Sequence, residues 1–471
     1  DKQTQAMVKN KPDKKKFRIA MVAACPFPAN HGSPASIKEM SEALVELGHE
    51  VHIVTYPIKE NIPVIGPFFH RVSIPFFNKN TITVGPSYEK FLLDPLMVFK
   101  LIYIIFKYKI DVIHAHNYEA ALIGWLAKIF TRRPMLYNAV NSMADELPTY
   151  DFFKSKKFAL KLGKALDRFV PGLGDFVTTV SDDLKSFLIE QGVPADKILV
   201  MPAGVNIEMF TQAEMFSIRD RHGLGDQPIV IYTGSLDAFQ RIDYLLEAMT
   251  RVIAEKPGAN LVIATSINNP AAIENCVSLS EKLGIKNNVV IVQDVSLDDL
   301  PSYLADADIA VLPRPECPGH PVKLLNYMSS KKAIVSFKGG AKGLHHMFNG
   351  YLADDHDVDH MARGILLLLN EPEYSRTLSE QAQNTVINHF TWKVLVGALE
   401  VIYEYLIDRD RNKVIDRNAL NQFVRESYVL QYVGRRKESG LGEYADCMRK
   451  EERRKSSREI DFIERRKVDF K

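Results

Sequence analysis

The sequence is poor in cysteine and contains no long apolar run. Its four cysteines, Cys25, Cys276, Cys317 and Cys447, lie far apart and form no CxxC pair, so neither a disulfide framework nor a zinc site is indicated. No stretch reaches the roughly 18 consecutive apolar residues that a membrane-spanning helix needs. We therefore expect reduced thiols, no bound metal and no segment that crosses a bilayer.

The sequence also lacks a strong charge of one sign. The formal net charge is +2 at pH 7, so any basic partner site has to arise from local clustering. The basic clusters carry neither aromatic stacking platforms nor a groove-reading helix, which argues against nucleic acid as a partner. The chain begins with the polar stretch DKQTQAMVKN, so we expect no signal peptide and a cytoplasmic location.

Apolar runs typical of buried parallel strands alternate with amphipathic helical segments along most of the chain. The alternation predicts an α/β protein with two doubly wound, Rossmann-like domains that face a cleft, over residues 15–203 and 204–388. We expect a disordered lead or tag remnant at 1–14 and a helix at 389–412 that returns to the N-terminal domain. The charged tail at 413–471 repeats Arg pairs, and an electrostatic docking arm is the alternative to a plain surface tail.

Two loops place small residues directly before a predicted helix. Gly32 and Ser33 precede the first helix, and a Pro/Gly-rich loop at 315–321 precedes another. The first loop exposes backbone N–H groups at a helix start and so favours a phosphate, although a plain turn is the alternative there, and the second has the outline of a nucleotide-binding loop. The second loop contains a single carboxylate, Glu316, which is unusual for a loop that grips a sugar.

Five segments occur in a fixed order, GSPASIKEMSEALVELGHEVHIVT, DVIHAHNYEAALIG, VTTVSDDLKSFLIEQGVPADKILVMPAGVNIEMF, YTGSLDAFQRIDYLLEAM and GHPVKLLNYMSSKKAIVSF. Together with FTW at 390–392, this set resembles the family 4 glycosyltransferases, retaining enzymes of the GT-B fold, over residues 15–410. The resemblance implies an acceptor-binding first domain and a second domain that binds a nucleotide-sugar donor. UDP-sugar is the first expectation, with GDP and ADP as alternatives. It also implies metal-independent transfer without a cofactor, in which positioning and charge stabilisation do most of the work.

Several charged residues of the family pattern are replaced in the second domain. The second of two family glutamates falls on Asn326 and the first on Pro318, for which Glu316 is a candidate substitute. The family's diphosphate-binding Arg and Lys fall on Ser235 and Gln240. Lys323 lies one helical turn before Asn326, on the same face, and a solvated surface lysine is the alternative. The expected donor-binding residues are Gly32, Ser33, Gly234, Ser235, Gln240, Arg241, Gly319, His320, Pro321, Val322, Lys323 and Asn326; Arg241 has a purely solvated role as its alternative.

The family's active-site histidine aligns with Val140, which can neither hydrogen-bond nor carry a proton. Asn141 and His116, the latter at the end of a predicted strand, are the candidate replacements in the first domain. With Glu316 they form the expected catalytic set. Asp145 and Glu146 are expected either to meet the acceptor or to cap a helix.

Two stretches of the first domain mix lysines with large apolar residues. One is DPLMVFKLIYIIFKYKI at 94–110, and the other is FFKSKKFALKLGKALDRFVPG at 152–172. This pattern is typical of an interfacial helix on anionic lipid, where each lysine contributes about 1 kcal/mol of attraction. A buried core helix is the alternative for the first stretch.

The sequence therefore predicts a glycosyltransferase that moves a sugar from a nucleotide-diphosphate donor, with retention, to a lipid-linked or cell-envelope glycan acceptor. We expect it to be peripheral on the cytoplasmic face of the inner membrane. The replaced residues keep two alternatives open: a non-catalytic GT-B module that binds a sugar nucleotide or a protein partner, and a nucleotide-sugar epimerase. The sequence does not indicate the sugar, the base, the acceptor or the oligomeric state.

Overall fold

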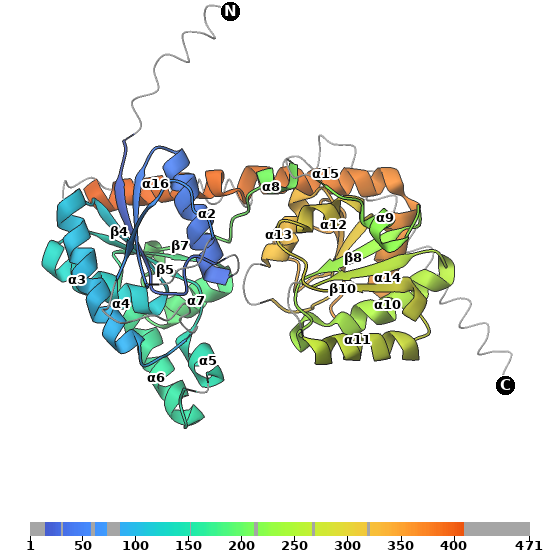
Figure 1. The fold of residues 1–471 in the computed structure, drawn as a ribbon, viewed down its shortest axis with the longest axis horizontal. Coiled ribbons are helices and arrows are strands. Elements are labelled where there is room, and N and C mark those ends of the chain that lie inside the picture. The colour runs from blue at the N-terminus through green and yellow to red at the C-terminus, as the bar shows by residue number, and fades with distance from the viewer. Residues whose placement is uncertain are drawn as a thin grey trace, which may run out of the picture.

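The computed structural model describes residues 15–29, 32–57, 62–72, 85–150, 152–211, 215–265, 269–317 and 321–408. The predicted lead, the charged tail at 413–471 with Cys447, and Pro318, Gly319 and His320 lie outside these residues. The described chain forms two α/β domains side by side, joined by the last helices (Figure 1). None of the helices in the described ranges is long and apolar enough to span a membrane.

The first domain is built on a seven-stranded parallel sheet in the order β3-β2-β1-β4-β5-β6-β7. Its central strands are buried from both sides because helices cover both faces, which explains their predominantly apolar sequences. The strands are β1 (Arg18–Ala23), β2 (Glu50–Thr55), β3 (Phe68–Arg71), β4 (Val112–His116), β5 (Met135–Ala139), β6 (Phe176–Thr179) and β7 (Ile198–Val200). The helices are α2 (Gly32–Glu46), α3 (Lys90–Tyr108), α4 (Asn117–Thr131), α5 (Met143–Glu146), α6 (Lys156–Phe169) and α7 (Asp182–Glu190).

The second domain repeats the design with a six-stranded parallel sheet in the order β10-β9-β8-β11-β12-β13. The strands are β8 (Ile229–Thr233), β9 (Asn260–Ala264), β10 (Val289–Val292), β11 (Ile309–Leu312), β12 (Ala333–Phe337) and β13 (Tyr351–Ala353). The helices are α8 (Glu208–Thr211), α9 (Ile218–His222), α10 (Ile242–Glu255), α11 (Pro270–Lys282), α12 (Leu300–Asp306), α13 (Val322–Ser329), α14 (Val358–Asn370) and α15 (Pro372–His389). The predicted pair of doubly wound parallel-sheet domains is confirmed.

The strand orders fix where ligands can bind. In the first sheet the winding reverses between β1 and β4, and in the second it reverses between β8 and β11. At such a switch point the loops that leave the two strands turn in opposite directions and open a crevice at their carboxyl ends. Each domain therefore has one preferred place for a site.

The last helix, α16 (Trp392–Asp408), leaves the second domain and packs on the first (Figure 1). Its apolar face joins the core cluster formed by β1, β2 and α2, and its Tyr403 hydroxyl lies 2.7 Å from Nδ1 of the buried His114. Where the chain enters α16, the indole Nε1 of Trp392 donates to Glu39 at 2.5 Å. The ring lies so close to the interdomain linker that a Cβ at Gly204 would approach it within 2.4 Å.

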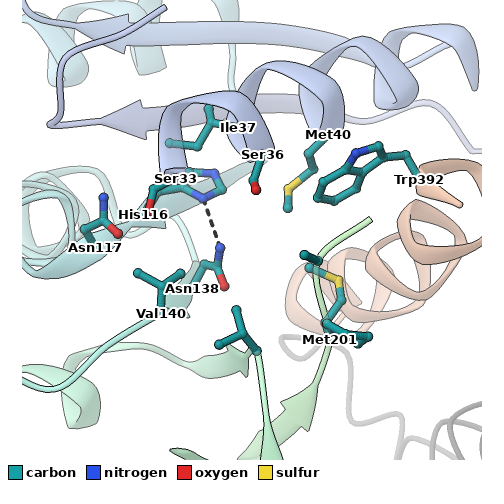
Figure 2. Close-up of a pocket in the computed structure, with 13 residues that line it drawn as sticks. Ser33, Ser36, Ile37, Met40, His116, Asn117, Asn138, Val140, Met201 and Trp392 are labelled. Atoms are coloured by element: carbon teal, nitrogen blue, oxygen red, sulfur yellow. Dashed lines mark hydrogen bonds between the residues drawn. The ribbon is translucent and has the colours of Figure 1, made fainter. Parts of the chain in front are cut away.

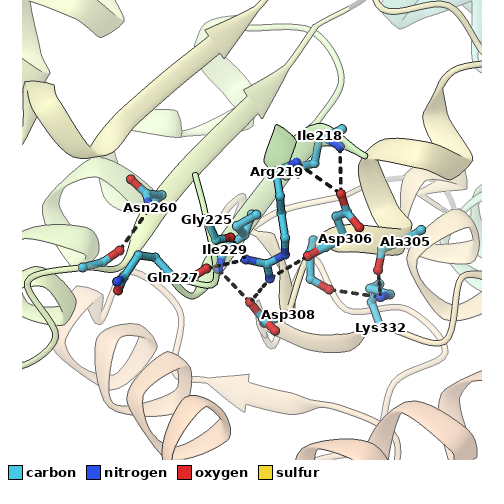
Figure 3. Close-up of polar contacts among 12 residues, drawn as sticks. Ile218, Arg219, Gly225, Gln227, Ile229, Asn260, Ala305, Asp306, Asp308 and Lys332 are labelled. Atoms are coloured by element: carbon cyan, nitrogen blue, oxygen red, sulfur yellow. Dashed lines mark hydrogen bonds and ion pairs between the residues drawn. The ribbon is translucent and has the colours of Figure 1, made fainter. Parts of the chain in front are cut away.

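A polar network ties together the amino ends of the second sheet (Figure 3). The Arg219 guanidinium donates to the carbonyls of Gly225, Gln227 and Asp306 and to the Asp308 carboxylate, at 2.6 to 3.1 Å. Lys332 donates to two carbonyls at the end of α12 and just beyond it, at 2.8 and 3.0 Å. Both cations of this edge are thus fully engaged by protein oxygens, and the network holds α9 and α12 to the sheet.

Candidate functional site

The second-domain cavity lies at the predicted switch point. It has a volume of about 150 Å³ and is lined by the end of β8, the end of β9, the segment around Ser296 and the first turns of α13. Three of the predicted donor-binding residues, Gly234, Lys323 and Asn326, line it together. The i, i+3 spacing therefore places Lys323 and Asn326 on one face of α13, as the sequence predicts.

The Lys323 ammonium is held by neutral groups. Its Nζ donates to the Tyr232 hydroxyl at 2.7 Å and to Oε1 of Gln240 at 2.9 Å, and it lies 4.4 Å from the centre of the Tyr232 ring. A Cβ at Gly234 would come within 2.6 Å of Nζ, so the approach of Lys323 to the end of β8 depends on this glycine. Burial, and next the nearby Arg314, lower the pKa of Lys323 to about 7.

The turn after β8 contributes neutral hydrogen-bonding groups to the surroundings of Lys323 rather than a charge. The Gln240 amide Nε2 donates to Ser235 Oγ at 3.5 Å, and the Tyr232 hydroxyl donates to the Ser235 carbonyl at 2.7 Å. Arg241 pairs with Asp243 at 2.6 Å and stacks on Tyr244, with its guanidinium carbon 3.4 Å from the ring centre. Arg241 is thus neither in the cavity lining nor purely solvated.

The loop after β11 carries the remaining predicted residues. Glu316 is exposed and does not line the cavity that holds Lys323 and Asn326. Pro321 precedes α13 and Val322 begins it, half exposed at 48%. Gly319 and His320 lie outside the described residues, so the predicted contact of this loop with a donor stays a prediction.

The first domain has a cavity of about 130 Å³ at its own switch point, shown in Figure 2. His116 at the end of β4 and Asn138 of β5 line it beside Val140, with Ser33 and Ser36 of α2 opposite. Asn138 Nδ2 lies 3.3 Å from Nδ1 of His116. Nε2 of His116 is buried and has no hydrogen-bond partner within the described ranges.

The electrostatic state of His116 follows from its position. The side chain is 1% exposed, and burial lowers the pKa of the imidazole to about 3. At neutral pH the ring is therefore uncharged, and it can donate or accept a hydrogen bond but cannot act as a positively charged acid. The predicted catalytic role of His116 stays a prediction, restricted to that of a neutral group.

A neighbouring cavity of about 250 Å³ collects polar groups from four elements. Gly32 and Ser33 lie on one wall, Asn141 and Glu146 lie near α5, and Lys90 of α3 forms a 3.1 Å ion pair with Glu119 of α4. Oδ1 of Asn141 and Oε2 of Glu146 are buried acceptors without a partner in the described chain. The cavity thus presents unsatisfied acceptors, which a ligand rich in hydroxyl donors would satisfy.

The buried carboxylate of Asp167 positions the start of helix α5. Asp167 of α6 accepts hydrogen bonds from the Ser142 hydroxyl, from the backbone N–H groups of Met143 and Ala144, and from Tyr118 at 2.5 Å. Ser142 is the N-cap of α5, and Glu146 stands at the N-cap position of the 3-10 helix Leu147–Thr149 without a side-chain capping hydrogen bond. Glu146 instead accepts a short hydrogen bond from Tyr150, and burial raises the pKa of its carboxyl.

Comparison with known proteins agrees with this architecture. The model of Glycosyltransferase Family 4 matches residues 31–209, and that of Glycosyl transferases group 1 matches residues 214–385, so the two matches span both domains in order. The chain belongs to family 4 of the glycosyltransferases.

Two relatives and one solved structure are similar to this chain. A D-inositol 3-phosphate glycosyltransferase of Thermobispora bispora is 25% identical over 80% of this chain and 90% of its own length. A GDP-mannose-dependent phosphatidylinositol monomannoside mannosyltransferase of Mycobacterium tuberculosis is 26% identical over 48% of this chain and 60% of its own. The structure of Anabaena Alr3699/HepE in complex with UDP superposes with a TM-score of 0.60 at 16% identity, over 82% of this chain and all of that one.

The glycosyltransferase fold separates the three predicted catalytic residues. His116 lines the smaller first-domain cavity, Asn141 lines the larger one, and Glu316 lines none of the three cavities described above. Sequence reasoning missed Lys90 and Arg314, because spacing along the chain does not indicate that they lie at the two switch points. In the described ranges, no group of three or more His, Cys, Asp or Glu side chains is placed to hold a metal ion.

The outer surface of the glycosyltransferase's first domain is unusually apolar. Helix α3 buries one face but exposes a second stripe at heptad-like spacing, and α3 packs against α4, which contacts the end of α6 through Trp125 and Phe169. The buried-core alternative for residues 94–110 therefore explains only one face of α3. The exposed large apolar side chains of this surface, which we call the outer apolar face, are Phe91, Leu92, Leu96, Phe99, Tyr103, Phe106, Leu126, Ile129, Phe130, Phe158, Leu160 and Phe169.

Proposed function

We propose that this glycosyltransferase moves a sugar from a nucleotide-diphosphate donor, a UDP-sugar first, onto a lipid-linked or cell-envelope glycan acceptor. We further propose that configuration is retained, that no metal ion takes part, and that the enzyme works at the cytoplasmic face of the inner membrane. The observation that carries the donor assignment is the Lys323 ammonium at the second-domain switch point, one turn from Asn326.

The donor part rests on charge and position. An ammonium with only neutral protein partners, beside a crevice at the carboxyl ends of β8 and β9, favours a phosphate group there. Asn326 on the same face of α13 offers an amide that can both donate to and accept from ribose hydroxyls. UDP in the related fold of Alr3699/HepE supports a uridine donor as the first to test.

The acceptor part rests on the larger first-domain cavity. Asn141 and Glu146 offer unpartnered oxygens to hydroxyl groups, and the one nearby lysine, Lys90, is already paired with Glu119. A polyhydroxylated ring suits such a lining. The named acceptor of the mycobacterial relative is a glycosylated lipid, which supports the same class here.

The membrane part rests on the outer apolar face and its charges. Phe99 is 70% exposed, Phe106 65% and Phe130 68%, far more than isolated surface residues require. The lysines of α6 and its approach, Lys154, Lys156, Lys157, Lys161 and Lys164, and also Arg132, Arg133 and Arg168, are exposed in the same domain. Exposed apolar side chains together with basic groups match an anionic lipid surface.

The decisive experiment measures donor binding and turnover in the same preparation. Calorimetric titration with UDP, GDP and ADP is expected to give saturable binding of one of them. Radiolabelled sugar from the matching donor is then expected to enter a lipid extract, with release of the nucleoside diphosphate. Binding without release from any donor would identify a non-catalytic binding module, and conversion of the donor without an acceptor would identify an epimerase.

A vesicle assay tests the membrane part separately. Wild-type protein is expected to sediment with vesicles of phosphatidylglycerol and phosphatidylcholine. Reversal of Lys157, Lys161 and Lys164 to Glu is expected to release it. The matched control reverses three exposed lysines elsewhere, Lys282, Lys331 and Lys393, and is expected to remain bound. Retention of the α6 variant on the vesicles contradicts the proposed surface.

A further inference from the structure

We propose that Arg314 and Lys323 together form the anion-binding centre that receives the diphosphate of the donor. All the positive charge of this centre then comes from one loop and the helix that follows it. The turn after β8 supplies only neutral support. The inference rests on the proposed function, since it names the residues that hold the donor's phosphates.

Topology brings the two cations together. Arg314 follows the end of β11 by two residues, and Lys323 is the second residue of α13, to which the same loop leads. Lys323 reaches across to the end of β8, the neighbour of β11 at the switch point, where it meets Tyr232 and Gln240. Lys323 therefore lines the crevice at the carboxyl ends of the strands, and Arg314 leaves the neighbouring strand β11 at the same edge of the sheet.

Neither cation has a carboxylate partner in the described part of the chain. The Arg314 Nη2 donates to Cys317 Sγ at 2.7 Å, and its Nε is buried without a hydrogen-bond partner within the described ranges. A buried guanidinium N–H without an acceptor is costly, and an incoming phosphate oxygen would remove that cost. Other arginines of this domain are differently placed: Arg219 pairs with Asp308, and Arg241 pairs with Asp243.

The two cations also oppose one another. After burial, Arg314 is the next cause that depresses the pKa of Lys323, while the exposed Asp237 and the buried Cys317 act in the opposite sense. A like charge nearby disfavours the charged form of Lys323, and an anion bound beside both cations would relieve this repulsion. A diphosphate carries two negative charges and several acceptor oxygens, so it satisfies both the ammonium and the forked guanidinium.

The backbone at Arg314 and Pro315 packs closely against the Gly339–Gly340 turn. A Cβ at Gly340 would lie 2.3 Å from the Arg314 carbonyl oxygen, and one at Gly339 would lie 2.0 Å from that of Pro315. The Gly339–Gly340 turn is itself fastened, because the Gly339 N–H donates to Asp355 at 2.9 Å. The glycine pair thus lets its backbone pack closely against the backbone of Arg314 and Pro315, which fixes the position of the Arg314 backbone.

The test is calorimetric titration of the full chain with UDP, GDP, ADP and inorganic pyrophosphate. Arg314→Met and Lys323→Met are each expected to weaken binding of the preferred nucleotide and of pyrophosphate at least tenfold. The matched controls remove exposed, paired cations of the same domain, Lys331→Met and Arg376→Met, and are expected to leave both affinities unchanged. Thermal unfolding of every variant checks that the fold is intact.

A charge exchange guards against a variant that merely misfolds. Nζ of Lys323 and Oε1 of Gln240 lie 2.9 Å apart, so the double variant Lys323→Gln, Gln240→Lys keeps one ammonium at nearly the same point. It is expected to recover most of the affinity that Lys323→Gln alone loses. A variant pair that binds no better than the single variant counts against the centre.

The outcomes separate the two proposals. Wild-type protein that binds UDP while Arg314→Met binds it equally well overturns the inference but leaves the proposed donor intact. Wild-type protein that binds pyrophosphate through Arg314 but no nucleotide overturns the proposed donor and supports the anion centre. Wild-type protein that binds none of the four probes overturns both.

Discussion

Each end of the second sheet carries one arginine and one lysine, but the groups that surround these cations differ between the two ends. At the amino ends, Arg219 and Lys332 are surrounded by carbonyl and carboxylate oxygens that belong to the protein. At the carboxyl ends, Lys323 contacts a hydroxyl and an amide, and Arg314 contacts a thiol. The cations at the amino ends are bound by oxygen atoms of the protein, whereas those at the carboxyl ends are the ones that we propose bind the donor's phosphates.

The difference teaches how to distinguish structural from functional charge in a single domain. Burial and residue type are similar at the two edges, so neither criterion separates them. The two edges differ in the hydrogen-bond acceptors around each cation. A charge without a protein counter-ion costs stability unless a ligand supplies one. Proteins commonly accept such a cost at their sites and nowhere else.

The largest expected effect is on the satisfied edge. Arg219→Met removes the side chain that joins three carbonyls to Asp308, so the free energy of unfolding should fall by about 2–4 kcal/mol, the scale of charge-assisted hydrogen bonds that are left unmade. Urea denaturation measures this loss. Donor affinity at low temperature should not change, and a variant that loses donor affinity while keeping its stability would break the comparison.

The second-largest effect tests whether the Gly339–Gly340 turn holds Arg314 in place at the carboxyl ends of the second sheet. Gly340→Ala forces a Cβ against the Arg314 carbonyl, which should cost about 1–3 kcal/mol of stability, as overpacking does. Titration calorimetry should show weaker donor binding as well. The control Gly397→Ala lies in α16, where nothing is within 4 Å of the new methyl group, and it should be neutral or slightly stabilising.

Asn326→Ala sharpens the comparison further, because it removes a neutral group from the same cavity. Loss of the amide should weaken donor binding by about 1–2 kcal/mol, the value of one or two hydrogen bonds to ribose hydroxyls. Pyrophosphate, which has no ribose, should bind as it does to the wild type. Equal losses for both probes would place Asn326 at the phosphates instead.

The smallest effect is a dependence on pH. Lys323 has a pKa of about 7 and binds an anion best when protonated, so the affinity for UDP-glucose should be highest below pH 7 and fall as the pH rises through it. Between pH 6 and pH 8 the loss should be about tenfold, or about 1.4 kcal/mol. Calorimetry in matched buffers measures it, and Lys323→Met should flatten the profile.

The sequence predicted the architecture better than the chemistry. The parallel strands were recognisable because sheets covered on both faces need apolar runs such as residues 19–23 and Ile309–Leu312. The pairing of Lys323 with Asn326 followed from helical spacing alone. Arg314 was missed because it lies in a loop, where neither helical nor strand spacing indicates which side chains end up buried without an acceptor; only the folded structure shows this for its Nε.

The first-domain site shows the same limit. The ion pair of Lys90 with Glu119 and the orphan oxygens of Asn141 and Glu146 come from α3, α4, the loop after β5 and α5, and only the folded sheet gathers them. The position of His116 at a strand end was predictable, whereas its loss of charge was not, because desolvation depends on what packs above it.

The return of α16 to the first domain has a consequence for synthesis on the ribosome. Part of the first domain's core, including the partner of His114, is made only after the whole second domain has been translated. At about 5–20 residues per second, roughly 10–40 s pass between synthesis of the last strand of the N-terminal sheet and synthesis of α16, which covers it. Nascent chains that stop before Trp392 should therefore be the species that chaperones capture.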